Sequence, residues 1–313
     1  MNVARRSDLG EPRGRVLVTG LSGFTGAHLE AVLAVAGFEV HGTIKAGEVA
    51  DERYHVADLD DLGALCKVVK RVRPTHVVHL AAISSVSHDD VQEIYRTNIV
   101  GTRNLLAALA DRRVSLAAPQ SILIASSANI YGNAEVEWID EDQPARPAND
   151  YAVSKIAMEH MAQLWSDRLP LTIVRPFNYT GVGQSKQFLI PKIVQAFVRR
   201  APELEIGNID VERDFSDVRD VVGAYVALLG NAPPGTFNIC SGRAISLRAI
   251  LELCEELTGH ALTLRVNPAF VRANEVKRLR GSNARLKQLL PEWAPRPIRE
   301  TVRWMIDTAS SAP

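Results

Sequence analysis

Short apolar runs alternate with amphipathic segments along the first half of the chain. The runs predict buried strands, and they are RVLVTG (15–20), FEVHGTI (38–44), THVVHLAA (75–82), SILIAS (121–126) and LTIVRP (171–176). The segments between them have helical spacing, with Gly37 and Pro74 as stop signals, and they cover 27–37, 61–74, 89–110 and 151–169. Strands that alternate with helices predict an α/β fold with a parallel sheet covered on both faces.

A glycine-rich loop, TGLSGFTG (19–26), joins the first predicted strand to the first predicted helix. Gly20 permits a tight turn, Gly23 lets the backbone approach a pyrophosphate, and Gly26 lets the helix pack near the strand. The free N–H groups of the helix then face the phosphate charge. A glycine triplet alone is weak evidence, but at this junction it predicts a Rossmann-type, doubly wound dinucleotide-binding domain.

The pattern also predicts how the chain is divided. Residues 15–178 are expected to form mainly the dinucleotide-binding domain. Residues 179–313 are more mixed, with predicted helices at 188–200 and 246–258, and are expected to form a smaller substrate-binding lobe from which some segments return to the first domain. Residues 1–14 are polar without apolar periodicity and predict a mobile tail.

Composition narrows the class of protein. The 313 residues are 46% hydrophobic and 23% charged, as in soluble globular proteins, and the formal net charge of +0 lacks the basic excess of nucleic-acid binders. No apolar run is long enough to span a bilayer. The three cysteines form no C-x-x-C pair, which argues against a metal site. Their odd number and the lack of a secretory leader favour the cytoplasm.

The choice of dinucleotide depends on the end of the second strand. NAD usually calls for an acid there, but this strand ends Thr43, Ile44, Lys45, and a cation attracts a 2′-phosphate. NADPH is therefore the expected cofactor, with NADH possible as well. The residues expected around it are Gly20, Ser22, Gly23, Phe24, Thr25, Gly26, Lys45, Asp58, Leu59, Leu80, Ala81, Ala82, Tyr151, Lys155 and Pro176.

Candidate chemistry lies in YAVSK (151–155). Tyr151 and Lys155 are one turn apart on one helix face, so Lys155 is expected to lower the phenol pKa from about 10 toward the working pH. Ser127, at the carboxyl end of a parallel strand, can hydrogen-bond a substrate oxygen. A Y-x-x-x-K pair alone is common on ordinary helices, and it gains weight from the glycine loop and the serine-bearing strand end.

In this order and spacing, TGLSGFTG, HLAA, SSANIYG and YAVSK resemble the extended short-chain dehydrogenases that act on nucleotide sugars. The resemblance covers nearly the whole chain from Arg15 onward. It implies a bound nicotinamide cofactor and a catalytic set of Ser127, Tyr151 and Lys155, with Asn98 in YRTNIVGT helping to order the site around the lysine. It also implies a homodimer that pairs through the helices at 89–110 and 151–169.

The second half is similar to the branch that handles GDP-mannose derivatives, and most similar to GDP-6-deoxy-4-keto-mannose reductases, which form GDP-D-rhamnose. The segments that carry this resemblance are RPFNYTGVGQ (175–184), GNIDVERDFSDVRDVV (207–222) and PAFVRANEVKRLRGSNARLK (268–287). It implies a GDP-sugar substrate bound by Ser84, Ser127, Asn178, Lys192, Arg213, Arg272 and Glu275. Paired arginines suit the dianionic pyrophosphate.

The same branch contains 4,6-dehydratases, which need a base and an acid for elimination. Related dehydratases carry Glu at the position of Asn129, and the glucose-type ones carry Asp at the position of Ala128. Alanine has no proton to give, and an amide is not a carboxylate base. We therefore predict NAD(P)H-dependent reduction of the C4 ketone of a GDP-4-keto-6-deoxy-hexose, giving GDP-D-rhamnose or its C4 epimer.

Two other hypotheses use the same residues. A nucleotide-sugar 4-epimerase would use the same Ser, Tyr and Lys with tightly bound NAD, although the acid expected for NAD is missing from the second strand. A catalytically inactive dinucleotide-binding protein has little reason to retain Ser127, Tyr151 and Lys155.

Overall fold

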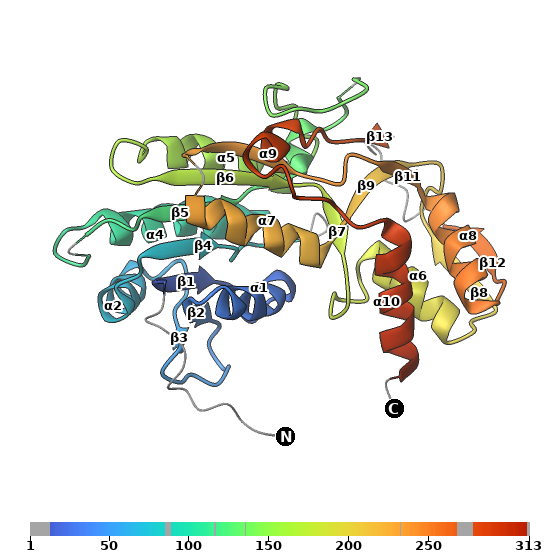
Figure 1. Cartoon of the computed structure of the whole chain (residues 1–313), viewed down its shortest axis with the longest axis horizontal. Coiled ribbons are helices and arrows are strands. Elements are labelled where there is room, and N and C mark those ends of the chain that lie inside the picture. The colour runs from blue at the N-terminus through green and yellow to red at the C-terminus, as the bar shows by residue number, and fades with distance from the viewer. Residues whose placement is uncertain are drawn as a thin grey trace. The chain divides into compact units, whose positions relative to one another are not determined.

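The structure is a computed structural model that describes residues 13–84, 89–115, 117–134, 136–231, 233–267 and 278–311. Its elements (Figure 1) are β1 (Arg15–Thr19), α1 (Phe24–Val35), β2 (Glu39–Ile44), β3 (Tyr54–Val56), α2 (Leu62–Val72), β4 (His76–His79), α3 (Val91–Tyr95), the π-helix η2 (Arg96–Gly101), α4 (Thr102–Ala110), β5 (Ser121–Ala125), the 3-10 helix η3 (Ala128–Tyr131), α5 (Asp150–Gln163), β6 (Leu171–Pro176), β7 (Asn178–Thr180), α6 (Leu189–Val198), β8 (Glu203–Ile206), β9 (Glu212–Asp217), α7 (Val218–Asn231), β10 (Gly235–Ile239), β11 (Ala244–Ser246), α8 (Leu247–Thr258), β12 (Thr263–Val266), β13 (Arg278–Leu279), α9 (Ala284–Leu289) and α10 (Ile298–Ser311).

A seven-stranded sheet has the order β10-β6-β5-β4-β1-β2-β3. The pairs β1–β2, β2–β3, β1–β4 and β4–β5 are parallel. The chain runs outward from β1 to β3 and then returns to the other side of β1 with β4, so the strand order reverses between β1 and β4. Dinucleotides bind at the carboxyl ends of strands at such a reversal. The predicted doubly wound parallel sheet is confirmed.

The chain forms two compact units. The first contains 1–126, 154–173 and 225–235, and the second contains 127–153, 174–224 and 236–313. The assignment of cofactor and substrate to separate domains stays a prediction. Of the predicted tail, residues 1–12 lie outside the described part. Arg13 contacts the turn that precedes β2, since its N–H donates to Gly37 O at 2.9 Å and its guanidinium lies over the Phe38 ring.

The core of the first unit forms where α2, α4 and α5 cover one face of the strands. Leu105, Leu106 and Met158, which lie on the two helices expected to pair in a dimer, are fully buried in this core. Helix α2 begins at the cap Asp61, whose carboxylate accepts from Ala64 N at 2.9 Å. It ends at Arg73 in the left-handed conformation, immediately before the predicted stop at Pro74.

The predicted helix at 89–110 is interrupted by a wider turn. Helix α3 passes into the π-helix η2 and then into α4. Such π-turns often occur at functional sites because they change the direction of side chains. Here the turn carries Asn98, which is 1% exposed.

The second unit has its own apolar core, formed mainly by α6, α8 and α10 with strands β8 and β9. Strand β9 is central to its small sheets. It pairs with β7 and β13 in parallel and with β11 in antiparallel orientation, while β8 pairs with β12. None of the helices in the described ranges is long and apolar enough to cross a membrane.

Candidate active site

The glycine loop has the geometry that its sequence predicts. Gly20 has a φ of 74°, which favours glycine, and a Cβ there would lie 3.0 Å from the backbone of Ala81. A Cβ on Gly26 would lie 2.5 Å from Gly20 O, so only glycine fits. Gly23, which has no side chain, caps α1, and a helix N-terminus of this kind can receive an anion. This cradle fits a pyrophosphate.

The end of β4 lies directly beside this loop. Leu80 N donates to Thr19 O at 3.2 Å, and Ala81 N donates to Thr19 Oγ1 at 3.2 Å. The predicted cofactor residues Leu80, Ala81 and Ala82 therefore follow β4 next to the loop that follows β1. Ser84 is exposed at the end of the same segment.

His79 is buried within β4 between two threonines. One ring nitrogen lies 2.6 Å from Thr19 Oγ1 and the other lies 2.8 Å from Thr102 Oγ1. Burial is the main cause that lowers the pKa of His79 to about 3, and the nearby Lys155 charge adds to it. Sequence reasoning missed this residue, although a histidine inside an apolar run was a visible signal.

The second strand ends as predicted, with Lys45 exposed just after β2. Sequence reasoning missed Glu48, whose carboxylate accepts from Ser22 Oγ at 3.1 Å. A negative charge thus lies at the glycine loop, close in sequence to the predicted 2′-phosphate ligand. The acid comes from the turn after the strand and not from the strand end, where the usual rule looks for it.

Asp58 and Leu59 follow β3. Asp58 is exposed, and its carboxylate accepts from Asp60 N at 3.0 Å. The Leu59 side chain is buried in the core, and its carbonyl accepts from Asn104 Nδ2 at 3.0 Å. Any contact of Leu59 with a cofactor would therefore use little of its side chain.

Ser127 and Tyr151 are brought together in the second unit. Ser127 caps η3, with its Oγ accepting from Asn129 N at 3.2 Å, and it also hydrogen-bonds the Tyr151 hydroxyl. Burial raises the pKa of Tyr151 to about 12, while the Ser127 hydrogen bond acts in the opposite direction. The predicted lowering of this pKa by Lys155 is therefore wrong, because desolvation of the phenolate outweighs other effects.

Lys155 is 4% exposed and lies one turn after Tyr151 on α5. Its Nζ donates to Ala125 O at 2.9 Å, at the end of β5. Burial lowers the pKa of Lys155 to about 8, and the charge of Glu159 opposes this. Glu159, another turn along the helix and 2% exposed, was not predicted from sequence, although its four-residue spacing from Lys155 was visible.

Asn98 holds two segments of the first unit together. Its Oδ1 accepts from Ile83 N at 2.9 Å, and its Nδ2 donates to Ile83 O and to Ser154 Oγ at 3.1 and 3.0 Å. It thus fixes the segment after β4 and the residue preceding Lys155. These contacts make Asn98 a positioning residue.

Asn178, at the start of β7, carries a buried polar atom without a partner. Within the described part of the chain its Nδ2 has no hydrogen-bond acceptor. Buried polar groups in proteins are almost always paired, so a ligand oxygen is the simplest partner for this amide. Pro176, the predicted cofactor contact, lies two residues before Asn178. It is the last residue of β6 and is buried.

Lys192 and Arg213 lie in the same unit as Asn178. Lys192 is on α6, and its Nζ donates to Glu205 O at 2.7 Å. Arg213 is on β9, the strand that pairs with β7, and its guanidinium donates to Glu212 O at 2.9 Å. Arg272 and Glu275, the other predicted nucleotide ligands, lie outside the described residues.

No carboxylate occupies the two positions that follow Ser127. Ala128 is 1% exposed and Asn129 is half-buried, and both belong to η3. The site therefore has a hydroxyl pair and a buried lysine but lacks the acid and base that elimination requires at these positions.

Comparison with known proteins gives consistent matches. The family model for GDP-mannose 4,6 dehydratase matches residues 17–305. GDP-6-deoxy-D-mannose reductase of Pseudomonas aeruginosa is 37% identical over 302 residues, which cover 92% of this chain and 95% of that protein. GDP-6-deoxy-D-talose 4-dehydrogenase of Aggregatibacter actinomycetemcomitans is 34% identical over 278 residues, which cover 88% of this chain and 91% of that protein.

Two solved structures also resemble this chain over nearly its whole length. The structure of RMD from Pseudomonas aeruginosa complexed with NADPH has a TM-score of 0.82 and 34% identity, covering 95% of this chain and 98% of that one. A proposed epimerase from Burkholderia cenocepacia J2315 has a TM-score of 0.90 and 47% identity, covering 97% and 100%. The resemblance that the motifs indicated is confirmed, and the chain belongs to the GDP-mannose 4,6 dehydratase family within the extended short-chain dehydrogenases.

Proposed function

We propose that the protein is an NAD(P)H-dependent oxidoreductase that reduces the C4 ketone of a GDP-4-keto-6-deoxy-hexose. The observation that carries this proposal is the pairing of Ser127 with Tyr151 beside Ala128 and Asn129. The site keeps the groups that reduction needs and lacks the carboxylates that dehydration needs. The two relatives named as a GDP-sugar reductase and a GDP-sugar dehydrogenase support the same class of reaction.

NADPH, when bound, supplies the hydride for C4. Ser127 and Tyr151 would both hydrogen-bond the ketone oxygen and polarise the carbonyl. The high pKa of Tyr151, about 12, keeps its proton at neutral pH, and the phenol donates that proton to the alkoxide as it develops. Lys155 then stabilises the phenolate by its positive charge, with Asn98 positioning the residue before it.

The residues around the glycine loop would hold the cofactor. Gly20, Gly23 and Gly26 leave space for the pyrophosphate, and Lys45 would attract a 2′-phosphate. The carboxylate of Glu48 beside Ser22 opposes that attraction, so we expect NADPH to be preferred with NADH still accepted. A Glu48→Gln variant should strengthen the preference for NADPH, measured as the ratio of kcat/KM for the two cofactors.

The second unit would hold the GDP moiety. Lys192 and Arg213 provide cations for a pyrophosphate, and Asn178 provides an unpaired buried donor. Arg272 and Glu275 would complete the set at the second phosphate and the ribose. The choice of guanine is supported by the names of the two relatives, whose substrates are GDP-sugars.

The test is incubation of the purified protein with NADPH and GDP-4-keto-6-deoxy-mannose. We expect oxidation of the cofactor, followed by absorbance, and a single C4 alcohol, identified by NMR. GDP-D-rhamnose and its C4 epimer, the 6-deoxy-talose derivative, are the two products that the relatives' names suggest. Absence of cofactor oxidation with this substrate would overturn the proposal and favour an inactive binding protein.

A 4-epimerase is the second candidate, because the Burkholderia structure is of a proposed epimerase. An epimerase retains its NAD and returns the hydride to the sugar. Protein purified without added cofactor should then carry stoichiometric NAD and interconvert GDP-sugars with no net change of reduced cofactor. We expect neither result.

We also propose a cytoplasmic homodimer, since Cys66, Cys240 and Cys254 are free thiols and the family resemblance implies pairing. Light scattering during size-exclusion chromatography measures the subunit number directly. A mass of one chain at micromolar concentration would contradict the dimer.

A further inference from the structure

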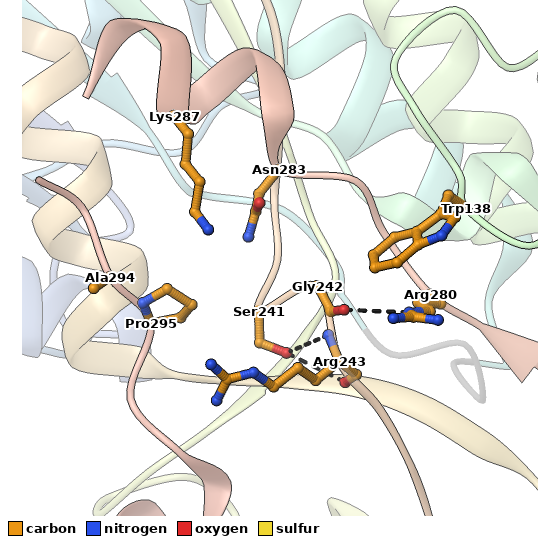
Figure 2. A pocket seen from close by; sticks show the side chains of 9 residues that line it. All are labelled: Trp138, Ser241, Gly242, Arg243, Arg280, Asn283, Lys287, Ala294 and Pro295. Carbon is orange, nitrogen blue, oxygen red and sulfur yellow. Dashed lines mark hydrogen bonds between the residues drawn. The ribbon is translucent and has the colours of Figure 1, made fainter. Parts of the chain in front are cut away.

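A pocket in the second unit is lined by none of the described residues placed above in the proposed reaction. It has a volume of about 390 Å³ and is lined by Trp138, Ser241, Gly242, Arg243, Arg280, Asn283, Lys287, Ala294 and Pro295 (Figure 2). Figure 2 shows Asn283 and Lys287 pointing into it from the start and body of α9, with the Ser241–Gly242 turn opposite. The volume suits a small organic ligand.

Three cations surround this pocket with little neutralisation. The Arg243 guanidinium and the Lys287 ammonium have no hydrogen-bond or ion-pair partner among the residues that the structure describes. The nearest acid to Arg280 is Glu137 at 3.7 Å, and the Glu137 side chain is 71% exposed, so this pair is weak and screened. The pocket therefore presents excess positive charge.

The floor of the pocket is rigid. The buried carboxylate of Asp214 accepts from Ser241 N at 2.8 Å, from Ser241 Oγ at 2.6 Å and from Gly242 N at 2.9 Å. These bonds fix the turn that carries Arg243. Because the Asp214 oxygens accept these hydrogen bonds, the carboxylate faces the backbone and does not neutralise the cations of the pocket. A site fixed in advance loses less entropy on binding.

Arg280 is held in place by two contacts. Its Nε donates to Gly242 O at 3.2 Å, and its guanidinium lies 3.4 Å from the centre of the Trp138 ring. Stacking on an aromatic ring leaves the outer N–H groups of an arginine available for an anion. Trp138, Ala294 and Pro295 add apolar walls for the uncharged part of a ligand.

We propose that this pocket binds a phosphorylated small molecule of about nucleotide size. Arg243, Arg280 and Lys287 would take the phosphate, because three cations match a dianion better than a single carboxylate. Trp138 and Pro295 would contact the organic part. The ligand is recognised by chain elements that the reduction does not use, so the pocket is a second ligand site.

The test uses inorganic pyrophosphate and GMP as probes, with binding followed by calorimetry and by the change in tryptophan fluorescence. The proposed substrate site also takes phosphates, so the titrations are made in an Arg213→Ala background, where adding Arg243→Ala/Lys287→Ala should lower the affinity about tenfold or more. Lys67→Ala, which removes an exposed charge in the first unit, and Arg213→Ala, in the proposed substrate site, should leave this binding in place. The Arg243 and Lys287 side chains are both exposed. Thermal melting checks that the double variant folds.

The outcomes separate the possibilities. Tighter binding of GMP than of pyrophosphate indicates a nucleotide-type ligand, and equal binding indicates that the phosphate group alone is recognised; both support the proposal. Binding in the Arg213→Ala background that Arg243→Ala/Lys287→Ala does not weaken places the probes outside this pocket and overturns the proposal, as does loss of all binding in Arg213→Ala alone. Absence of binding by wild-type protein also overturns it.

Discussion

Tyr151 is the residue whose chemistry the structure changes most. A phenol with a pKa of about 12 cannot serve as a base at neutral pH, but it can hold and donate a proton. The direction of the proposed reaction, ketone to alcohol, requires such a donor. A protonated phenol therefore matches the donor role proposed for Tyr151 in reduction.

A Tyr151→Phe variant should retain the fold and lose the reaction. We expect kcat to fall by about 10²- to 10⁴-fold, since a positioned proton donor contributes that much. The assay is oxidation of NADPH with the 4-keto sugar nucleotide, with thermal melting as the control for folding. Near-full activity of the variant would remove Tyr151 from the mechanism.

His79 predicts a pH effect on stability. Its pKa is lowered in the folded protein to about 3, so between this value and 6.5 the unfolded chain binds more protons, and stability falls as the pH falls. Relative to a His79→Gln variant, wild-type protein should lose about 2 kcal/mol of its free energy of unfolding between about pH 7 and about pH 5. Urea titrations at each pH measure this difference.

The matched control is His160→Gln, which replaces an exposed histidine on α5. Its unfolding free energy should follow that of the wild type at every pH. If the His79→Gln and wild-type proteins show the same pH slope, the buried imidazole does not carry the effect.

At the scale of elements, the junction of β1 and α1 leaves no room for a side chain. Gly26→Ala would place a Cβ against two carbonyl oxygens of the loop, one of them 2.5 Å away, so the helix must shift. We expect a loss of about 1–3 kcal/mol in stability and a weaker affinity for NADPH. Gly223→Ala in α7, where a Cβ meets nothing within 4 Å, is the control and should be neutral or stabilising.

Denaturant titration measures the stability of both variants, and fluorescence titration measures their NADPH affinity. An unchanged NADPH affinity in Gly26→Ala would show that close packing of this junction does not matter for cofactor binding.

The sequence predicts elements better than it predicts their environments. Periodicity locates β1, β2, β4, β5 and β6 because buried strands are short and continuously apolar. It misses the π-turn in 89–110, since one additional residue in a turn hardly changes the apolar spacing. The spacing of Tyr151 and Lys155 is also correct, but the sign of the Tyr151 pKa shift depends on burial, which spacing does not report. Glu48 is missed because a turn, not a strand, brings it to Ser22.

At the scale of the whole molecule, the division into two units predicts which backbone amides each ligand should protect from hydrogen exchange. In hydrogen exchange, NADPH should slow the amides of the first unit around residues 15–26 and 76–83. GDP should slow those of the second unit around 178–193 and 206–215. The exposed segment of β12, which is not expected to contact either ligand, serves as a reference.

The result that would contradict this assignment is protection of the same unit by both ligands. It would mean that the predicted division into a cofactor domain and a substrate lobe is wrong, although the reductase activity itself could remain.

The π-turn at Arg96–Gly101 has a consequence for sequence alignment and for engineering. Removing a single residue from this turn could convert it to a regular α-helix. The helix would still be continuous, so the deletion would be difficult to recognise. Because the wider turn already takes up the additional residue, the helices on either side would stay nearly in phase, and the change would fall on the side chains inside the turn. Asn98 would then lose Ile83 or Ser154. We expect insertions and deletions in natural or designed variants to be excluded from these six positions, even where substitutions are tolerated.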